Sequence, residues 1–160
     1  KVFGKDYFSF RHGNFAAVAI NTTIIHAPQN VTGIVEEQKK WLDTELIKLK
    51  SQGATQIVIF QHHPWFVQKA SEPSSYGSIP LERRQEYIDL LKKHGVKQAF
   101  GGHIHKNAIA DDGIEMISTS AVGKPFDVEG SGFRVGIVRN GTVEHTFYPL
   151  SKIPNQIKLD

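Results

Sequence analysis

The stretch IVIFQHHP, residues 57–64, decides the fold of this chain. Its first four residues are apolar, mostly β-branched and without alternation, which predicts a strand covered on both faces. His62 follows two positions beyond the end of that strand. Because reactive groups in open α/β sheets lie just beyond the carboxyl ends of the strands, His62 is a candidate functional residue.

A second pair of histidines follows another short apolar run. Residues 96–100 predict a strand, and the letters GGHIH at 101–105 come directly after it. Between the two runs, residues 81–94 carry apolar side chains at helical spacing and precede Gly95, which predicts a helix. Residues 57–100 therefore predict a β-loop-α-β unit with parallel strands, so both histidine clusters emerge at one edge of the sheet.

The remaining segments extend this α/β pattern. They predict a hairpin over 7–10 and 15–20, a helix over 34–50, and strands at 107–110, 115–120, 133–139 and 142–148. Asn140 and Gly141 predict the turn of the last hairpin. The loop at 64–80 is longer than most connections in compact domains, and we expect it to border a substrate cleft.

Composition limits the classes of function. With 160 residues of which 39% are apolar, the chain predicts a single unit over 1–160. The net charge of +3 is small, so nucleic acid is not favoured as a partner. No apolar stretch approaches the ~20 residues that cross a bilayer, so no membrane partner is expected. The absence of cysteine excludes disulfides and thiolate metal sites.

The two clusters favour a metal site held by imidazole, the commonest neutral ligand of transition metals. His103 and His105 are two residues apart, so in an extended segment both rings project to one side. Gly101 and Gly102 allow the backbone to come close to the site. Neighbouring strands lie about 4.8 Å apart, so we expect His62, His103 and His105 to reach one metal centre.

Other histidines and aromatic residues have less specific signals. His26, His94 and His145 stand alone in the sequence and are expected to be surface or helix-end groups. Trp65 and Phe66 follow the first cluster, and two roles stay open for them. They either pack under the loop or line the substrate cleft.

The motifs QHHP at 61–64 and GHIH at 102–105 resemble the last two motifs of the calcineurin-like metallophosphoesterases, His-x-Pro and Gly-His-x-His. The letters FGKDYFSF at 3–10, WL at 41–42 and STSAVG at 118–123 are similar to the cytosolic Ser/Thr protein phosphatase branch of that family. The resemblance covers nearly the whole chain but only the carboxyl half of the family domain. It implies an α/β fold, the carboxyl half of a four-layer sandwich in which helices flank mixed sheets.

The resemblance also implies a dinuclear centre. By that likeness His62 and His103 would bind the second metal, and His105 would bind the first. His63 stands at the variable position between His and Pro and is a further candidate for the substrate cleft. Family members carry manganese, iron or zinc. These ions polarise phosphoryl oxygens and lower the pKa of a bound water, so that hydroxide attacks a phosphate monoester.

The family's earlier motifs are missing from this chain. No Asp is followed two residues later by His, and neither Gly-Asp nor Asn-His occurs. The resemblance therefore implies that the acidic ligands belong to an amino-terminal half outside this chain, and no residue here is a confident catalytic group. Three neutral imidazoles do not compensate the positive charge of two divalent ions. We therefore expect the segment alone to be inactive and to hold one weakly bound ion at most.

The sequence thus predicts the carboxyl half of a cytoplasmic, metal-dependent hydrolase that acts on a phosphorylated substrate. Two alternatives stay open. One is a non-catalytic module that binds phosphate or another protein. The other is a cyclic nucleotide phosphodiesterase or a nuclease of the same superfamily, since these enzymes share the metal ligands.

Overall fold

The computed structural model describes residues 4–139 and 142–157. Its helices are α1 (Thr22–His26), α2 (Thr32–Ser51), α3 (Leu81–Lys93) and the 3-10 turn η1 (Leu150–Lys152). Its strands are β1 (Phe8–His12), β2 (Phe15–Ala19), β3 (Gln56–Phe60), β4 (Gln98–Gly101), β5 (Ala108–Asp111), β6 (Glu115–Ser118), β7 (Gly132–Arg139) and β8 (Thr142–Pro149). Phe3 of the opening motif and the turn predicted at Asn140 and Gly141 lie outside the described residues.

Six strands form one mixed sheet in the order β1-β2-β3-β4-β6-β5. The four central strands run parallel, and β1 and β5 pair antiparallel at the two edges. The predicted parallel pairing of β3 with β4 is confirmed, with Ile59 opposite Ala99. Strands β7 and β8 form a separate antiparallel ribbon. The predicted α/β class, with mixed sheets flanked by helices, is therefore confirmed.

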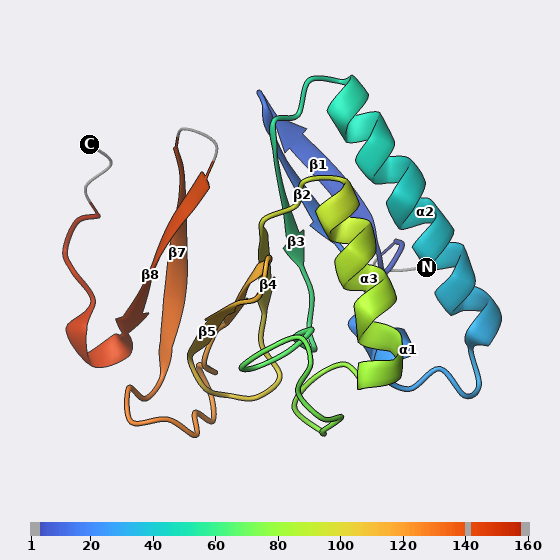
Figure 1. Cartoon of the computed structure of the whole chain (residues 1–160). Helices are drawn as coiled ribbons and strands as arrows, with labels where there is room; N and C mark the ends of the chain where they lie inside the picture. The colour runs from blue at the N-terminus through green and yellow to red at the C-terminus, as the bar shows by residue number, and fades with distance from the viewer. Residues whose placement is uncertain (1–3, 140–141, 158–160) are drawn as a thin grey trace.

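The elements form three layers (Figure 1). Helices α2 and α3 cover one face of the six-stranded sheet, and the β7–β8 ribbon lies on the other side. The side chain of Gln98 in β4 links the sheet to the ribbon, because it donates to the carbonyl oxygen of Val143 at 2.9 Å and accepts from its N–H at 3.0 Å. The ribbon is therefore attached to the face of the sheet opposite the helices.

Strand β3 shows why its sequence lacks alternation. Ile57 and Ile59 belong to the large core that the sheet forms with the helices. Val58 points to the opposite face and packs with Ala17 and Val143 in a second, smaller core. Both faces of the strand are thus apolar because each one is buried against a different layer.

The sequence patterns predict neither the 3-10 turn η1 nor helix α1. Helix α1 has five residues, which is too short for a helical period to emerge, and it begins where the side chain of Asn21 accepts a hydrogen bond from the Thr23 N–H at 3.0 Å. Other boundaries move by two residues. Helix α2 begins at Thr32 rather than residue 34, and β6 ends at Ser118 rather than residue 120.

Candidate metal centre

The carboxyl ends of β3 and β4 are tied together just before the histidines. The Gln61 N–H donates to the carbonyl oxygen of Phe100 at 2.9 Å, and the Gly102 N–H donates to that of His62 at 3.0 Å. These bonds continue the parallel ladder past the ends of the two strands. The two histidine clusters therefore leave the sheet side by side, as the β-loop-α-β pattern predicts.

The short helix α1 fixes the turn that carries His62 and His63. The hydroxyl oxygen of Thr22, a fully buried residue, accepts from the backbone N–H of His62 at 3.2 Å and of His63 at 2.8 Å. At the other end of α1, the His26 ring stacks on that of His63, with 4.4 Å between centroids and 16° between planes. An element that the sequence analysis missed thus positions the first cluster.

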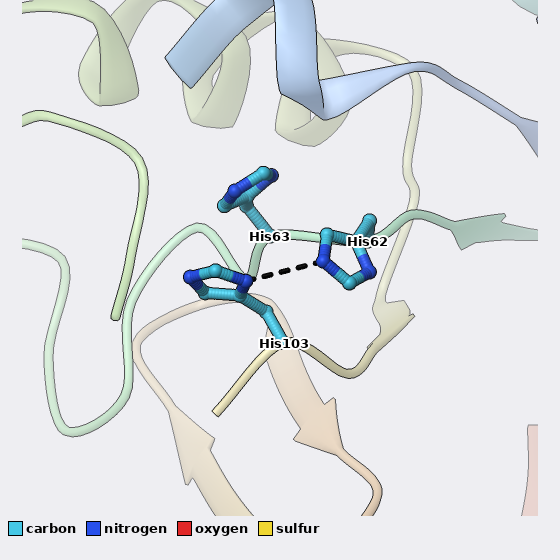
Figure 2. Close-up of side chains that lie close together, drawn as sticks. All are labelled: His62, His63 and His103. Atoms are coloured by element: carbon cyan, nitrogen blue, oxygen red, sulfur yellow. Dashed lines mark hydrogen bonds between the residues drawn. The ribbon is translucent and has the colours of Figure 1, made fainter. Parts of the chain in front are cut away.

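Three imidazoles converge beyond the sheet edge (Figure 2). One nitrogen from each of His62, His63 and His103 lies within 4.8 Å of the other two, and we call these residues the imidazole group. Nδ1 of His103 and Nε2 of His62 are hydrogen-bonded at 3.1 Å. Nε2 of His103 lies 2.9 Å from the carbonyl oxygen of Tyr76, which can only accept. Nε2 of His103 is therefore the donor to that oxygen, and in this tautomer Nδ1 is the acceptor that faces His62.

The imidazole group fits a metal ion by geometry. Two nitrogens bound about 2.1 Å from one ion at ordinary ligand angles lie roughly 3.0–3.4 Å apart. The observed separation of 3.1 Å between His62 Nε2 and His103 Nδ1 matches this spacing. Nδ1 of His63 is buried and has no hydrogen-bond partner among the described residues. Because buried polar atoms are nearly always paired, that orphaned nitrogen is also consistent with a ligand site.

The protonation states fit a metal as well. Burial, reinforced by the neighbouring His103, His26 and His62, lowers the pKa of His63 to about 4. Burial also lowers the pKa of His62, with smaller contributions from His103 and His105. Both rings are therefore neutral at pH 7, and neutral imidazole is the form that binds metals.

The imidazole group has no negative charge of its own. Within residues 4–139 and 142–157, no Asp or Glu oxygen joins the three nitrogens. A divalent cation held only by neutral ligands in a partly buried site keeps its full charge, which is electrostatically unfavourable. The donor set therefore fits one weakly held ion and not a charge-compensated pair.

His105 lies outside the imidazole group. Its Nδ1 is 2.7 Å from the carbonyl oxygen of Lys124, and its ring stacks on Phe126 with 5.2 Å between centroids. The expectation of an extended segment is wrong, because φ is +66° at His103 and +54° at His105. Two left-handed residues break the alternation that would send both rings to one side. Non-glycine residues in this region are strained and gather at functional sites.

The loop at 64–80 reaches over the imidazole group. Its residue Tyr76 supplies the carbonyl oxygen that orients His103. Tyr76 is 81% exposed, and the centroid of its ring lies 4.7 Å from that of the His103 ring. The sequence carries no signal for this contact beyond the unusual length of the loop.

Two charged side chains, the buried Arg84 and the half-buried Glu72, hold this loop through hydrogen bonds to its backbone. The guanidinium of Arg84, which is fully buried, donates to the carbonyl oxygens of Ala70 at 2.7 Å and Ile79 at 2.8 Å. The Glu72 carboxylate accepts from three consecutive backbone N–H groups, those of Val67, Gln68 and Lys69. Burial alone would raise the pKa of Glu72, but these donors outweigh it and the pKa falls below its usual value.

Trp65 and Phe66 are both fully buried in the large core. The Trp65 ring stacks on that of Tyr87 in α3, with 5.2 Å between centroids. Of the two roles that the sequence leaves open, packing under the loop is the one that the structure supports. A fully buried side chain offers no surface to a substrate, whereas His63 lies in the imidazole group itself.

The three histidines that stand alone in the sequence have different surroundings in the structure. His94 follows the last residue of α3 and pairs with Asp43 at 2.6 Å, so the helix-end prediction is confirmed. His145 is not a surface group, because its side chain is largely buried against the sheet and contacts Arg134 at 2.9 Å. His26 ends α1, but it stacks on the imidazole group and its Nε2 is buried.

Comparison with known proteins gives related phosphatases, although no family model matches the chain. The chain is 29% identical over 154 residues to the serine/threonine-protein phosphatase CPPED1 of Bos taurus. It is 28% identical over 155 residues to the protein of that name from Homo sapiens. In both cases the match takes in 96% of this chain and 49% of the relative. The chain thus spans about half the length of the curated relatives it matches.

The fold also has a counterpart among solved structures. The structure described as "GAP50 the anchor in the inner membrane complex of Plasmodium" superposes with a TM-score of 0.53 at 20% identity, over 71% of this chain and 36% of that one. None of the helices in the described part of this chain is both long enough and apolar enough to span a bilayer. The resemblance of this chain to the calcineurin-like metallophosphoesterases, and among them to the Ser/Thr protein phosphatase branch, is confirmed over nearly its whole length.

Proposed function

We propose that this chain is the carboxyl half of a metal-dependent phosphoesterase domain that hydrolyses phosphate monoesters. The relatives' name, serine/threonine-protein phosphatase, suggests phosphorylated protein as the substrate. The observation that carries the proposal is the pair of nitrogens, His62 Nε2 and His103 Nδ1, that face each other at 3.1 Å without a carboxylate between them. That arrangement suits a shared cation better than two unrelated histidines.

Each residue of the site has a part in this proposal. His62 would offer Nε2 to the ion and His103 would offer Nδ1, while the Tyr76 carbonyl oxygen lies 2.9 Å from Nε2 of His103 and so orients the ring. His105 would be a further ligand if its Nδ1 left the Lys124 carbonyl oxygen. A manganese, iron or zinc ion held there would supply Lewis acidity towards phosphoryl oxygens and lower the pKa of a bound water.

The proposal extends to a second ion and to the missing charge. The complete domain would hold two ions, and its carboxylate ligands would come from the amino-terminal half that the relatives carry in addition. This accounts for the neutral character of the imidazole group, in which no described Asp or Glu takes part. It also accounts for the match to only half of each relative.

Metal removal from the complete protein, as its full reading frame encodes it, tests the proposal. We expect hydrolysis of a phosphoserine peptide to fall at least about 100-fold when a chelator removes the metal, and to return with Mn²⁺, because the metal supplies most of the charge stabilisation. Metal content is measured alongside the rate, and a cyclic nucleotide is assayed in parallel. Activity that persists without metal contradicts the proposal. A metal-loaded protein that hydrolyses neither compound is the non-catalytic module.

A further inference from the structure

Arg134 of β7 joins the β7–β8 ribbon to residues 101–107, which carry the second histidine cluster and which we call the histidine segment. The ribbon lies on the side of the sheet opposite the helices (Figure 1). Nε of Arg134 donates to the hydroxyl oxygen of Thr119 at 3.1 Å, and Nη2 donates to the side-chain oxygen of Asn107 at 2.9 Å. Asn107 ends the histidine segment, and the Thr119 N–H donates to the carbonyl oxygen of Gly101, where the segment begins, at 2.9 Å. One guanidinium therefore reaches both ends of the segment.

Contacts within the ribbon fix this guanidinium. Nη1 of Arg134 lies 2.9 Å from Nδ1 of His145 in β8, and that nitrogen is the acceptor because a guanidinium can only donate. The side chain of His145 is only 8% exposed. The guanidinium also lies over the Phe147 ring, 5.8 Å from its centroid. Because the five N–H groups of a guanidinium lie in one rigid plane, three bonds in that plane leave the side chain little freedom.

The histidine segment needs such support because its backbone is strained. His103 and His105 both have left-handed φ angles, +66° and +54°. Residues other than glycine keep such angles only where the surrounding structure holds them there. Asn107 supplies a fixed end, because its N–H donates to the Asp127 carboxylate at 2.7 Å and its side-chain oxygen accepts from the guanidinium. The bond from the ribbon thus acts next to the two strained residues.

We propose that Arg134 is a positioning residue for the metal site, because it holds the histidine segment in the shape that turns His103 towards His62. The inference rests on the proposed function, since it adds a residue to the same site. Among the hydrogen bonds of the described residues, none joins Arg134 to the imidazole group. Arg134 therefore acts through Asn107 and Thr119, and not as a ligand.

Two variants of the complete protein, Arg134→Met and Arg134→Lys, test this role. Methionine keeps an unbranched side chain against Phe147 but removes all three bonds, whereas lysine keeps the charge but not the planar fork. We expect the Kd for Mn²⁺ to rise about 10–100-fold in both variants, which is the usual cost of losing a group that orients a ligand. We also expect amide hydrogen exchange of the histidine segment to become at least about 10-fold faster, with or without the metal, because the segment opens more often.

The matched control is Gln98→Ala. Gln98 also ties the sheet to the ribbon, through two hydrogen bonds to Val143, but its side chain has no printed bond to the histidine segment. We expect this variant to lower the Tm, as Arg134→Met does, and to leave both the Mn²⁺ affinity and the exchange of the segment unchanged. Circular dichroism shows which variants are folded, and Arg134→Lys carries the test if Arg134→Met is not.

The outcomes separate this inference from the proposed function. If either the affinity or the exchange stays unchanged in the Arg134 variants of a metal-binding protein, the positioning role is overturned. Equal changes in Gln98→Ala also overturn it, because a loosened ribbon would then be a sufficient cause. If the unsubstituted protein binds no Mn²⁺, the proposed function fails. Faster exchange in the Arg134 variants alone would still support the hold of Arg134 on the segment.

Discussion

Replacement of His103 by alanine is expected to lower the phosphate ester hydrolysis proposed for the complete protein by at least about 100-fold, since changes in groups that merely support a ligand already cost 10–100-fold. His103 connects the loop at 64–80 to the proposed metal site. Its Nε2 is fixed by the Tyr76 carbonyl oxygen, and its Nδ1 faces His62. Alanine removes the lone pair and leaves the Tyr76 oxygen without its donor.

The control for this variant is His12→Ala, in which an exposed histidine at the end of β1 is lost. We expect that variant to keep the activity and metal content of the unsubstituted protein. Thermal unfolding of both variants shows whether the fold survives, and elemental analysis gives the bound metal. Near-normal rates with full metal content in His103→Ala would remove His103 from the site.

We expect the 160-residue chain by itself to show no hydrolysis of a phosphate monoester above the uncatalysed rate, even with Mn²⁺ present. The reason is electrostatic. The imidazole group supplies neutral ligands only, and no described carboxylate compensates the charge of two divalent ions. Without that compensation we expect at most one weakly bound ion, and not the pair of ions that the proposed reaction needs.

This prediction needs a safeguard against contaminating phosphatases. The same chain with His103→Ala serves as the blank, because a contaminant would be equally active in both preparations. Circular dichroism establishes that the chain is folded under the assay conditions. Turnover by the chain that exceeds the blank and depends on added metal would contradict the half-site account.

The placement of the two clusters could be predicted because it follows from short-range signals. The unbroken apolar run at 57–60 identifies a doubly covered strand, and the helix at 81–94 requires the next strand to run parallel. These two facts are enough to bring His62 and His103 to one edge. The structure confirms this with a single hydrogen-bonded ladder that continues into the clusters.

The orientation of side chains within the site could not be predicted in the same way. The direction of His105 depends on left-handed backbone at His103 and His105, and no residue type in that segment requires it. The ring of His26 contacts that of His63 because His26 is the last residue of α1. A helix of five residues is too short to show a helical period in the sequence. Both are set by packing between distant segments.

The position of the β7–β8 ribbon shows a further limit of sequence patterns. The strands at 133–139 and 142–148 were predicted, but the sequence does not say against which face their ribbon lies. The position of the ribbon depends on Val143, which packs with Ala17 and Val58 in the second core. The side chain of Gln98 is hydrogen-bonded to the backbone of the same residue. Only the structure shows that Phe8 and Phe10 of β1 and Phe60 of β3 remain exposed.

The most direct test of the account is the position of the metal in crystals of the complete protein grown with Mn²⁺. An anomalous-scattering map is predicted to place an ion in bonding contact, at about 2.1 Å, with Nε2 of His62 and Nδ1 of His103, and to show carboxylate ligands from outside this chain. An ion bound elsewhere, with these two nitrogens still hydrogen-bonded to each other, would contradict it.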